Sequence, residues 1–381
     1  MRSNINSCYI HIPFCNEICS YCDFCKFYYN EKIVDNYLDA LEKEIDEIYK
    51  GDLLETIYIG GGTPSSLNIK QLNKLFNIMS KLNKKDNCSI TIENNFESTT
   101  KEKLDLYKSN GINRLSFGIE TINKDNLKLL NRKLDKSHIK EIINYSKKIG
   151  IKDINLDLIY ALPNQSIKDL KEDLKYILSL KPTHISTYSL IIEEHTILFI
   201  NKYKNINEEL DLSMYEEIIK ELKKNNYNHY EISNFALPGY ESRHNICYWN
   251  NDKFYGFGLG AASYINNKRI LNTRSINNYI KGKRIIEEEL ITKTDDMNYQ
   301  IILNLRLKTG INKKVFKEKY NIELKDYINY KDLVDNKLLV ETKDNIYIPE
   351  DKLYISNSII EKLLIKWYFN NRSDFYEWRN I

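Results

Sequence analysis

The sequence predicts an α/β fold in which about six short strands alternate with helices and form a parallel sheet. Two observations carry this prediction. Short apolar runs recur along the first half of the chain, and a longer amphipathic stretch separates each run from the next. The repeat of roughly 25–50 residues suits a partial or full β/α barrel. A doubly wound open sheet uses the same repeat and is the alternative.

The expected strands are the short apolar runs, taken in chain order. They cover residues 8–12, 56–59, 89–92, 113–117, 153–156 and 184–188. The expected helices are the amphipathic stretches between them, at residues 33–49, 69–79, 101–109, 137–149 and 167–180. Because neighbouring parallel strands need a crossover connection, each helix is expected to join one strand to the next in the right-handed sense.

The regular alternation ends near residue 190. A helix is expected at 212–224, followed by an irregular segment at 229–264. Beyond Met297, two or three short helices and a strand at 346–349 predict a small α/β domain that resembles a winged helix. The sequence therefore predicts a barrel core at 1–230, an extension at 231–290 and a small C-terminal domain at 291–381. No element is assigned to residues 367–381.

The charge balance and the hydropathy argue against two classes of protein, nucleic-acid-binding proteins and integral membrane proteins. The chain has 56 basic and 53 acidic residues, a formal net charge of +3, and no long block of one sign. This balance argues against nucleic-acid binding by bulk electrostatics. No apolar run approaches the length of a membrane helix, and residues 1–12 lack the pattern of a signal peptide. We therefore expect a cytosolic protein that is not an integral membrane protein.

Four of the seven cysteines lie between Cys15 and Cys25. An odd, clustered set in a cytosolic chain suggests metal binding rather than disulfides. The C-x3-C-x2-C spacing of Cys15, Cys19 and Cys22 brings three thiolates onto one loop, where they can hold three irons of a cubane and leave the fourth open. The alternative is a structural zinc site completed by Cys25 or His11. Such sites usually use two separated pairs, and the chain has no second pair.

Polar or special residues gather where the expected strands end. The cysteines follow the first strand and the glycines 60–62 follow the second. Glu93 ends the third strand, Glu120 lies just past the fourth, and Asp157 ends the fifth. Because the site of a β/α barrel lies at the carboxyl ends of its strands, these loops predict a single pocket.

The stretch from Tyr9 to Cys22 carries a family resemblance. It reads Y-I-H-I-P-F-C-x3-C-x2-C and resembles the start of the coproporphyrinogen-oxidase-like branch of radical SAM proteins. The resemblance implies a partial (β/α)6 TIM-like barrel. It also implies a [4Fe–4S] cluster on the three cysteines, with S-adenosylmethionine (SAM) on the fourth iron. Cys25 departs from the family spacing and is interpreted as a bystander.

The same resemblance extends along the expected pocket. The segments G-G-G-T-P at 60–64, E-N-N at 93–95, N-R-L-S-F-G-I-E at 113–120 and N-L-D-L-I-Y-A-L-P at 155–163 are similar to SAM-contacting motifs of the family. Three positions depart from it: Phe96 replaces a proline, Glu120 a glutamine and Ala161 a glycine. Glu120 can accept but, when ionised, cannot donate a hydrogen bond, so its partner can differ. The residues implied to contact SAM are Tyr9, Gly61, Gly62, Thr63, Glu93, Glu120, Arg132 and Asp157.

The stretch 243–249 reads R-H-N-I-C-Y-W. Histidine is a common axial ligand of heme iron, and Tyr and Trp offer flat faces to a porphyrin. A loop histidine with packing aromatics is the alternative. The stretch resembles the H-N-x-x-Y-W signature of heme chaperones of the HemW type, which implies heme contacts from His244, Tyr248 and Trp249. Cys247 is a competing ligand at the same place.

The resemblance implies a heme chaperone that binds heme, delivers it to apo-hemoproteins and takes it from a heme donor, with no catalytic residue assigned. The first alternative is the family's oxygen-independent coproporphyrinogen III oxidase, an enzyme of porphyrin biosynthesis. The first ligand cysteine, Cys15, leaves no room for the N-terminal extension that helps the oxidase to hold its substrate, which favours the chaperone. The second alternative is a structural metal protein that binds neither heme nor SAM.

Overall fold

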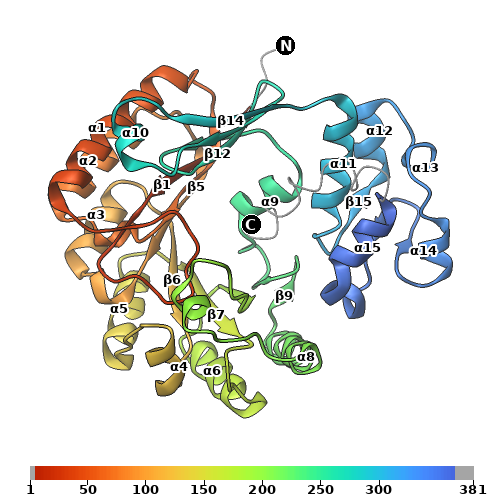
Figure 1. Cartoon of the computed structure of the whole chain (residues 1–381), viewed down its shortest axis with the longest axis horizontal. Helices are drawn as coiled ribbons and strands as arrows, with labels where there is room; N and C mark the ends of the chain where they lie inside the picture. The colour runs from red at the N-terminus through yellow and green to blue at the C-terminus, as the bar shows by residue number, and fades with distance from the viewer. Residues whose placement is uncertain (1–4, 365–381) are drawn as a thin grey trace. The chain divides into compact units, whose positions relative to one another are not determined.

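The computed structural model describes residues 5–364 and divides the chain into two compact units (Figure 1). The first unit contains the residues up to 228 together with 233–244 and 252–290. The second contains 229–232, 245–251 and the described residues from 291 to 364. The stretch 367–381, for which the sequence predicts no element, lies outside the described residues.

Six parallel strands form the centre of the first unit, and they lie side by side in chain order. They are β1 (Ser7–Ile12), β4 (Leu54–Gly61), β5 (Lys84–Asn94), β6 (Arg114–Glu120), β7 (Asp153–Tyr160) and β8 (His184–Ser189). A doubly wound sheet would reverse its strand order at a switch point, and this part of the sheet does not. The barrel-type prediction is therefore confirmed, and each expected strand overlaps an observed one. The strand expected at 113–117 begins one residue later and ends three residues later, at Arg114–Glu120.

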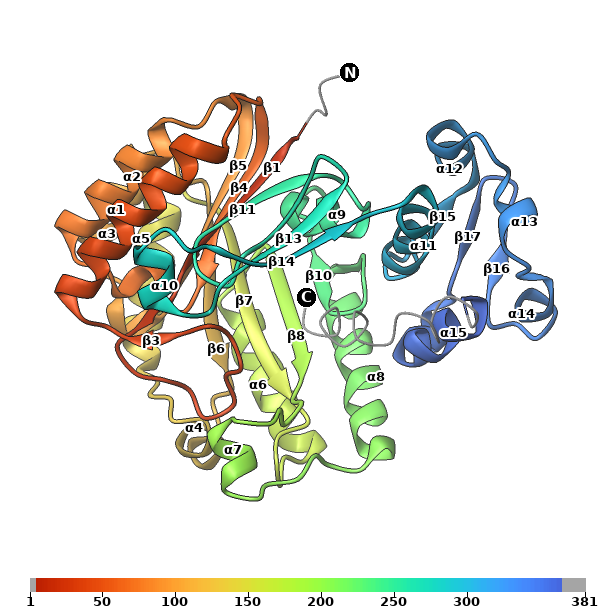
Figure 2. The ribbon, with the colours of Figure 1, turned by 45° about the horizontal axis from the view of Figure 1, so that its top comes forward.

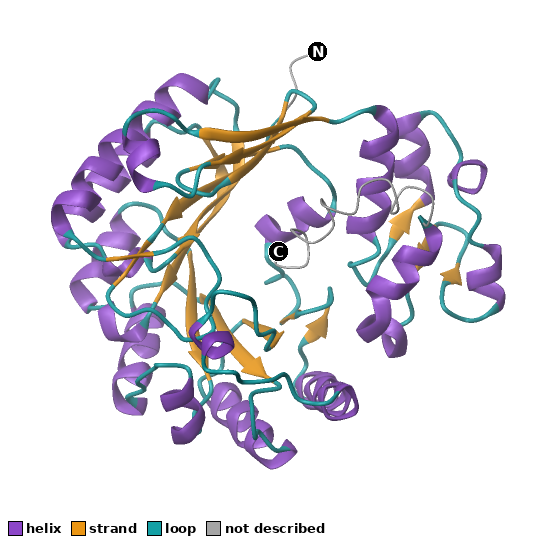
Figure 3. Ribbon diagram, in the orientation of Figure 1, coloured by secondary structure: helices purple, strands orange, loops and turns teal. Residues whose placement is uncertain are grey.

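Helices cover one face of this sheet, as the purple helices beside the orange strands show in Figure 3. They are α1 (Glu31–Ile48), α2 (Ile69–Ser80), α3 (Lys101–Ser109), α4 (Lys124–Leu129), α5 (Lys136–Lys148) and α6 (Ile167–Ser179). Polar side chains fix where they begin. Asn68 and Ser166 each close a capping box, with Gln71 and Asp169 respectively. Of these six helices, only the short α4 is not expected from the sequence.

The two faces of the parallel sheet differ in chemistry because side chains alternate along a strand. Ile10, Ile57, Leu115, Ile154 and Ile185 are fully buried and form part of the apolar core. The residues between them are mostly polar and contact one another across the strands on the opposite face. They include Tyr9, Tyr58, Glu93, Ser116 and Asp157. A polar interior face of this kind is where a ligand site is expected.

Further strands extend both edges of this sheet. On the β1 side lie β11 (Phe254–Phe257), which is parallel to β1, and then β12 (Ala262–Ile265), β13 (Lys268–Asn272) and β14 (Ile285–Leu290), which are antiparallel. On the other side, β10 (Asn234–Ala236) pairs antiparallel with β8. The fully buried Glu44 of α1 anchors the β11 side by accepting hydrogen bonds from Gly258 N, Asn272 Nδ2 and Tyr279 Oη.

The second unit is a small α/β assembly. Its helices are α11 (Lys293–Asn304), α12 (Lys313–Tyr320), α13 (Leu324–Tyr327), α14 (Lys331–Asp335) and α15 (Ser356–Leu363). Its antiparallel sheet has the order β15 (Ile311–Asn312), β17 (Asn345–Tyr347) and β16 (Val340–Glu341). Helices followed by a strand hairpin match the expected winged-helix-like arrangement, and β17 lies where a strand was expected.

The length and apolarity of a helix decide whether it can cross a membrane. Between residues 5 and 364, no helix is both long and apolar enough to cross a membrane.

Candidate functional site

The cysteines lie on a loop whose base is closed by two short parallel strands. These are β2 (Phe14–Cys15) and β3 (Phe27–Tyr28). Tyr29 N donates to Cys15 O at 2.8 Å, which fastens the loop where it begins and ends. Figure 2 shows this loop at the end of the sheet toward which β7 and β8 point. The loop therefore stands at the carboxyl ends of the parallel strands, as predicted.

The three cysteines of the motif share one electrostatic environment. Burial raises the pKa of Cys15, Cys19 and Cys22, and each of them is also raised by the charge of another of the three. Two donors oppose this effect: Thr63 Oγ1 donates to Cys15 Sγ at 3.4 Å, and Arg132 Nη1 donates to Cys19 Sγ at 3.9 Å. Thiolates at these positions would therefore be stabilised by groups that are already in place.

The donor chemistry of this loop fits an iron–sulfur cluster, because its three motif cysteines offer sulfur ligands. All seven cysteines are free thiols. Within the described part of the chain, no three His, Cys, Asp or Glu side chains are placed to hold a metal ion. Cys25 differs from the other three in its neighbour, because its Sγ lies 3.9 Å from Arg274 O. Burial raises its pKa to about 11, and the charges of Arg274 and Lys26 oppose the rise.

The glycine segment packs directly against the cysteine strand. Gly61 is the last residue of β4, so the first two glycines belong to the strand and not to the turn expected there. Gly62 N donates to Ile12 O at 2.9 Å, and Thr63 N donates to Phe14 O at 2.8 Å. A Cβ atom on Gly62 would lie 2.9 Å from Cys15 Sγ and from the Phe14 nitrogen. Glycine is required at this position because the two segments touch.

Glu93 lies near the end of β5 and is held by both carboxylate oxygens. Its Oε1 accepts from Tyr58 Oη at 2.7 Å, and its Oε2 accepts from Gly61 N at 2.9 Å. Burial raises its pKa, and these two donors lower it. The carboxylate is therefore a half-buried group that holds the glycine segment through Gly61 N.

Glu120 ends β6 in a left-handed backbone conformation, with φ of 65°. Burial raises its pKa, and the charge of Arg132 opposes the rise. Tyr21 Oη donates to Glu120 Oε1 at 3.0 Å, while Arg132 Nη2 donates to Gly118 O at 2.9 Å. Arg132 thus spans from Gly118 to the sulfur of Cys19, and it links the carboxylate side of the site to the cysteine loop.

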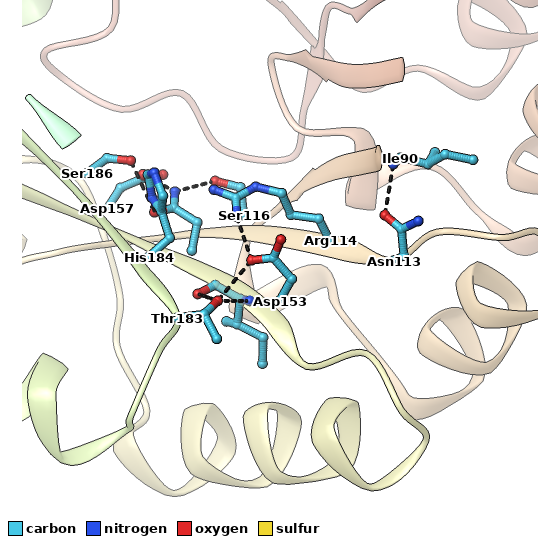
Figure 4. A network of polar contacts seen from close by, with 11 residues as sticks. Ile90, Asn113, Arg114, Ser116, Asp153, Asp157, Thr183, His184 and Ser186 are labelled. Carbon is cyan, nitrogen blue, oxygen red and sulfur yellow. Dashed lines mark hydrogen bonds and ion pairs between the residues drawn. The ribbon is translucent and has the colours of Figure 1, made fainter. Parts of the chain in front are cut away.

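Asp157 lies inside β7, which continues for three more residues to Tyr160, and not at the strand end that the sequence suggested. Figure 4 shows it within a polar network of neighbouring strands. Asn155 Nδ2 donates to Asp157 Oδ1 at 2.7 Å and to Ser116 Oγ at 2.8 Å, and His184 Nδ1 lies 2.6 Å from Asn155 Oδ1. Burial raises the pKa of Asp157, and the charge of Glu93 raises it further.

Ala161, which stands where the family has a glycine, has a strained backbone conformation. Ala161 follows β7 and is buried, and its φ is 60°, in the left-handed region that favours glycine. The neighbouring Tyr160 and Leu162 are also buried, so the strain sits in the core beside the site.

Three carboxyl groups therefore lie in one part of the site: Glu120 is buried, while Glu93 and Asp157 are half-buried. The charge of Arg132 acts on Glu120, and the charge of Arg114 acts on Asp157. The pKa values of Glu93, Glu120 and Asp157 are all raised first by burial and also by the charge of another acid of this set. An excess of partly buried carboxylates disfavours their own ionisation and favours a cationic ligand. SAM carries an ammonium and a sulfonium group, so the charges of this site fit that cofactor.

The H-N-x-x-Y-W stretch forms a helix, α9 (Arg243–Trp249), and not an open loop. His244 belongs to the first unit and is 3% exposed. Its Nδ1 lies 2.8 Å from Thr56 Oγ1, and its ring stacks on that of Tyr58 with centroids 5.1 Å apart. Burial lowers the pKa of His244 to about 3, so the imidazole is neutral at physiological pH.

The two aromatic residues of the stretch belong to the second unit. Tyr248 is half-buried and Trp249 is buried. Trp249 is held by that unit, because Asn304 Nδ2 donates to its carbonyl oxygen at 2.8 Å and the Arg306 guanidinium lies 5.6 Å from its ring centroid.

Two further residues of the site are not singled out by the sequence motifs: Thr56 and Tyr58. Thr56 and Tyr58 alternate with Ile57 and Ile59 on β4, so they face the interior with Gly60. This alternation is visible in the sequence and could have identified them. Tyr21 lies beside the cysteines in the sequence, but its bond to Glu120 depends on a contact between distant segments.

Comparisons with known proteins agree with this geometry. The model of the Radical SAM superfamily matches residues 9–177, which include the cysteine loop, the glycine segment, Glu93, Glu120, Arg132 and Asp157. The heme chaperone HemW of Lactococcus lactis is 35% identical over 375 residues, covering 96% of this chain and 99% of that protein. HemW of Bacillus subtilis is 36% identical over 376 residues, covering 94% and 99%.

A solved structure has the same fold. The structure of the Escherichia coli coproporphyrinogen III oxidase HemN, described as a radical SAM enzyme, aligns with a TM-score of 0.84 and covers 94% of this chain and 89% of its own. The sequence identity is 23%, so this likeness concerns the fold.

Proposed function

Because the chain belongs to the HemW family of radical SAM proteins, we propose that it binds heme and delivers it to apo-hemoproteins. The observation that carries this proposal is the extent of the similarity to proteins named heme chaperone HemW, which spans nearly the whole length of both chains. The stretch around His244, with its H-N-x-x-Y-W pattern, adds a feature suited to heme. Heme is the cargo in this proposal and not a substrate that the chain converts.

Membership of the radical SAM superfamily implies a [4Fe–4S] cluster and SAM. We assign three of the four irons of that cluster to Cys15, Cys19 and Cys22. When bound, the cluster and SAM together supply one-electron chemistry. Thr63 and Arg132 stabilise thiolate charge through their contacts with Cys15 and Cys19, and the clasp between β2 and β3 keeps the loop closed at its base.

The cofactor side of the site is assigned to residues around the carboxylates. Glu93, Glu120 and Asp157 offer negative charge to a cationic ligand, and Arg132 suits a ligand carboxylate. The glycine segment packs closely against Cys15 and Glu93, which holds its backbone beside the cysteine loop. The residues proposed to contact SAM are Tyr9, Gly61, Gly62, Thr63, Glu93, Glu120, Arg132 and Asp157.

The heme side is assigned to α9. His244 is neutral because burial lowers its pKa to about 3, and the neutral imidazole is the form that ligates iron. Tyr248 and Trp249 supply flat aromatic faces. Since His244 is 3% exposed, it must leave its present position to reach iron.

A kinetic hand-over experiment tests the delivery step. The heme-loaded chain would be mixed under anaerobic conditions with increasing amounts of an apo b-type cytochrome from the organism that encodes it, and the Soret band followed. Delivery by contact predicts a transfer rate that rises with acceptor concentration. It also predicts a rate above that of heme loss to excess apomyoglobin. A rate that equals passive loss at every acceptor concentration would contradict delivery by this protein.

A further inference from the structure

A column of aromatic side chains runs through the first unit, from the cysteine loop to His244. The ring of His244 stacks on Tyr58 at 5.1 Å with an interplanar angle of 26°, and Tyr58 stacks on Tyr9 at 6.1 Å and 29°. Tyr9 Oη lies 2.9 Å from His11 Nδ1, and His11 Nε2 lies 2.8 Å from Cys25 O. Tyr9 and Tyr58 are directly paired on the neighbouring strands β1 and β4, so the column follows the register of the sheet.

Tyr58 is the member of this column that also belongs to the carboxylate site. Its hydroxyl donates to Glu93 Oε1, and the other oxygen of Glu93 accepts from Gly61 N. Gly60, Glu93 and Tyr58 pack tightly together, because a Cβ on Gly60 would lie 2.9 Å from both the Glu93 carboxyl and the Tyr58 ring. Each oxygen of Glu93 already accepts one of these donors, so a ligand group that binds Glu93 enters a crowded carboxylate beside the Tyr58 ring.

His244 is held in its buried position by two contacts with β4. One is the hydrogen bond to Thr56, at 2.8 Å, and the other is the stack on Tyr58. The position of Tyr58 is in turn fixed by Glu93. His244, which is assigned to heme, and Glu93, which is assigned to SAM, thus both contact the side chain of Tyr58.

We propose that Tyr58 is a positioning residue that couples the SAM site to the heme site. This proposal rests on the proposed function, since it requires both ligands to bind. With SAM bound, Glu93 would accept a hydrogen bond from the ligand in place of the one from Tyr58 Oη. The Tyr58 ring would then hold His244 less firmly, and the imidazole would be free to reach heme iron. SAM therefore raises the affinity for heme, and by linkage heme raises the affinity for SAM by the same factor.

The test is a heme titration of the anaerobically prepared, cluster-containing protein, with and without saturating SAM and without a reductant. Soret absorbance gives the dissociation constant in each case. The wild-type protein is expected to bind heme at least about fivefold more tightly with SAM, a typical size for coupling between two sites. Titrating SAM with and without heme measures the reciprocal factor and requires no variant.

Three variants locate the coupling. Tyr58→Phe removes the bond to Glu93 and should bind heme without SAM as tightly as the SAM-bound wild type, with no further response to SAM. Thr56→Val removes the hydrogen bond to His244 Nδ1 and should bind heme more tightly while it keeps its response to SAM. Tyr107→Phe is the matched control, because Tyr107 is a fully buried tyrosine on α3, outside the column. Its dissociation constants should equal those of the wild type.

The outcomes separate this inference from the function on which it rests. If the wild type binds both ligands but its affinity for heme does not change with SAM, the coupling is wrong and the proposed function stands. If Tyr58→Phe retains the full response to SAM, the coupling does not pass through Tyr58. If the wild type binds no heme, both the inference and the proposed function fail.

Discussion

Replacing Cys15, Cys19 or Cys22 singly by serine is expected to remove nearly all cluster iron and its broad visible absorbance. A serine hydroxyl is a poor ligand for iron at neutral pH, and two thiolates cannot hold a cubane that needs at least three protein ligands. The loop itself should remain, because its base is closed by backbone bonds between β2 and β3 that serine does not disturb. Iron and sulfide analysis after anaerobic reconstitution measures the effect.

Cys25→Ser and Cys88→Ser are the matched controls for this experiment. Cys25 lies on the same loop but its Sγ lies 3.9 Å from Arg274 O, and Cys88 is a buried residue of β5. Both variants should keep about four irons per chain. Loss of the cluster in Cys25→Ser, with retention in one of the other three variants, would mean that the ligand set is different. Zinc without sulfide in the wild type would mean a structural zinc site.

A single added methyl group at Gly62 is expected to damage the site almost as much. In Gly62→Ala the new Cβ would lie 2.9 Å from Cys15 Sγ, from the Phe14 nitrogen and from the Pro13 carbonyl carbon. Two of these atoms are backbone, so the glycine segment and the cysteine strand must move apart. We expect the free energy of unfolding to fall by about 1–3 kcal/mol. We also expect SAM affinity to fall at least about tenfold, or about 1.4 kcal/mol.

Gly239→Ala controls for the general effect of removing a glycine. Gly239 has a φ of 85°, but a Cβ added there would meet nothing within 4 Å, so alanine at this position is strained without a clash. Denaturant unfolding and equilibrium dialysis of SAM compare the two variants. If Gly239→Ala loses as much SAM affinity as Gly62→Ala, close packing against Cys15 is not the reason that glycine is required.

The parallel core could be predicted from the sequence because its signals are local. Apolar residues alternate with polar ones along the strands, and side chains such as Asn68 and Ser166 mark where helices begin. Strand ends are harder to predict, since pairing with a neighbour extends a strand beyond its apolar run. Pairing with β8 carries β7 past Asp157 to Tyr160, and pairing with β1 carries β4 into the glycine segment.

The features that could not be predicted depend on contacts between distant segments. The left-handed backbone at Glu120 and Ala161 is imposed by the turns that follow β6 and β7. The short helix around His244 has aromatic residues and an asparagine with weak helix propensity, so tertiary packing decides its conformation. The burial of His244 against Thr56 and Tyr58 is a consequence of that packing.

The most direct test of the account is a heme titration of the anaerobically prepared protein, compared with His244→Ala and His195→Ala. His195 is exposed in the loop after β8, so it controls for adventitious binding by a surface histidine. The account predicts saturation near one heme per chain, an affinity at least about tenfold lower or an altered Soret band in His244→Ala, and no change in His195→Ala. The absence of saturable binding by the wild type would contradict the proposed function. Binding lost in His195→Ala and unchanged in His244→Ala would contradict the assignment of heme to α9.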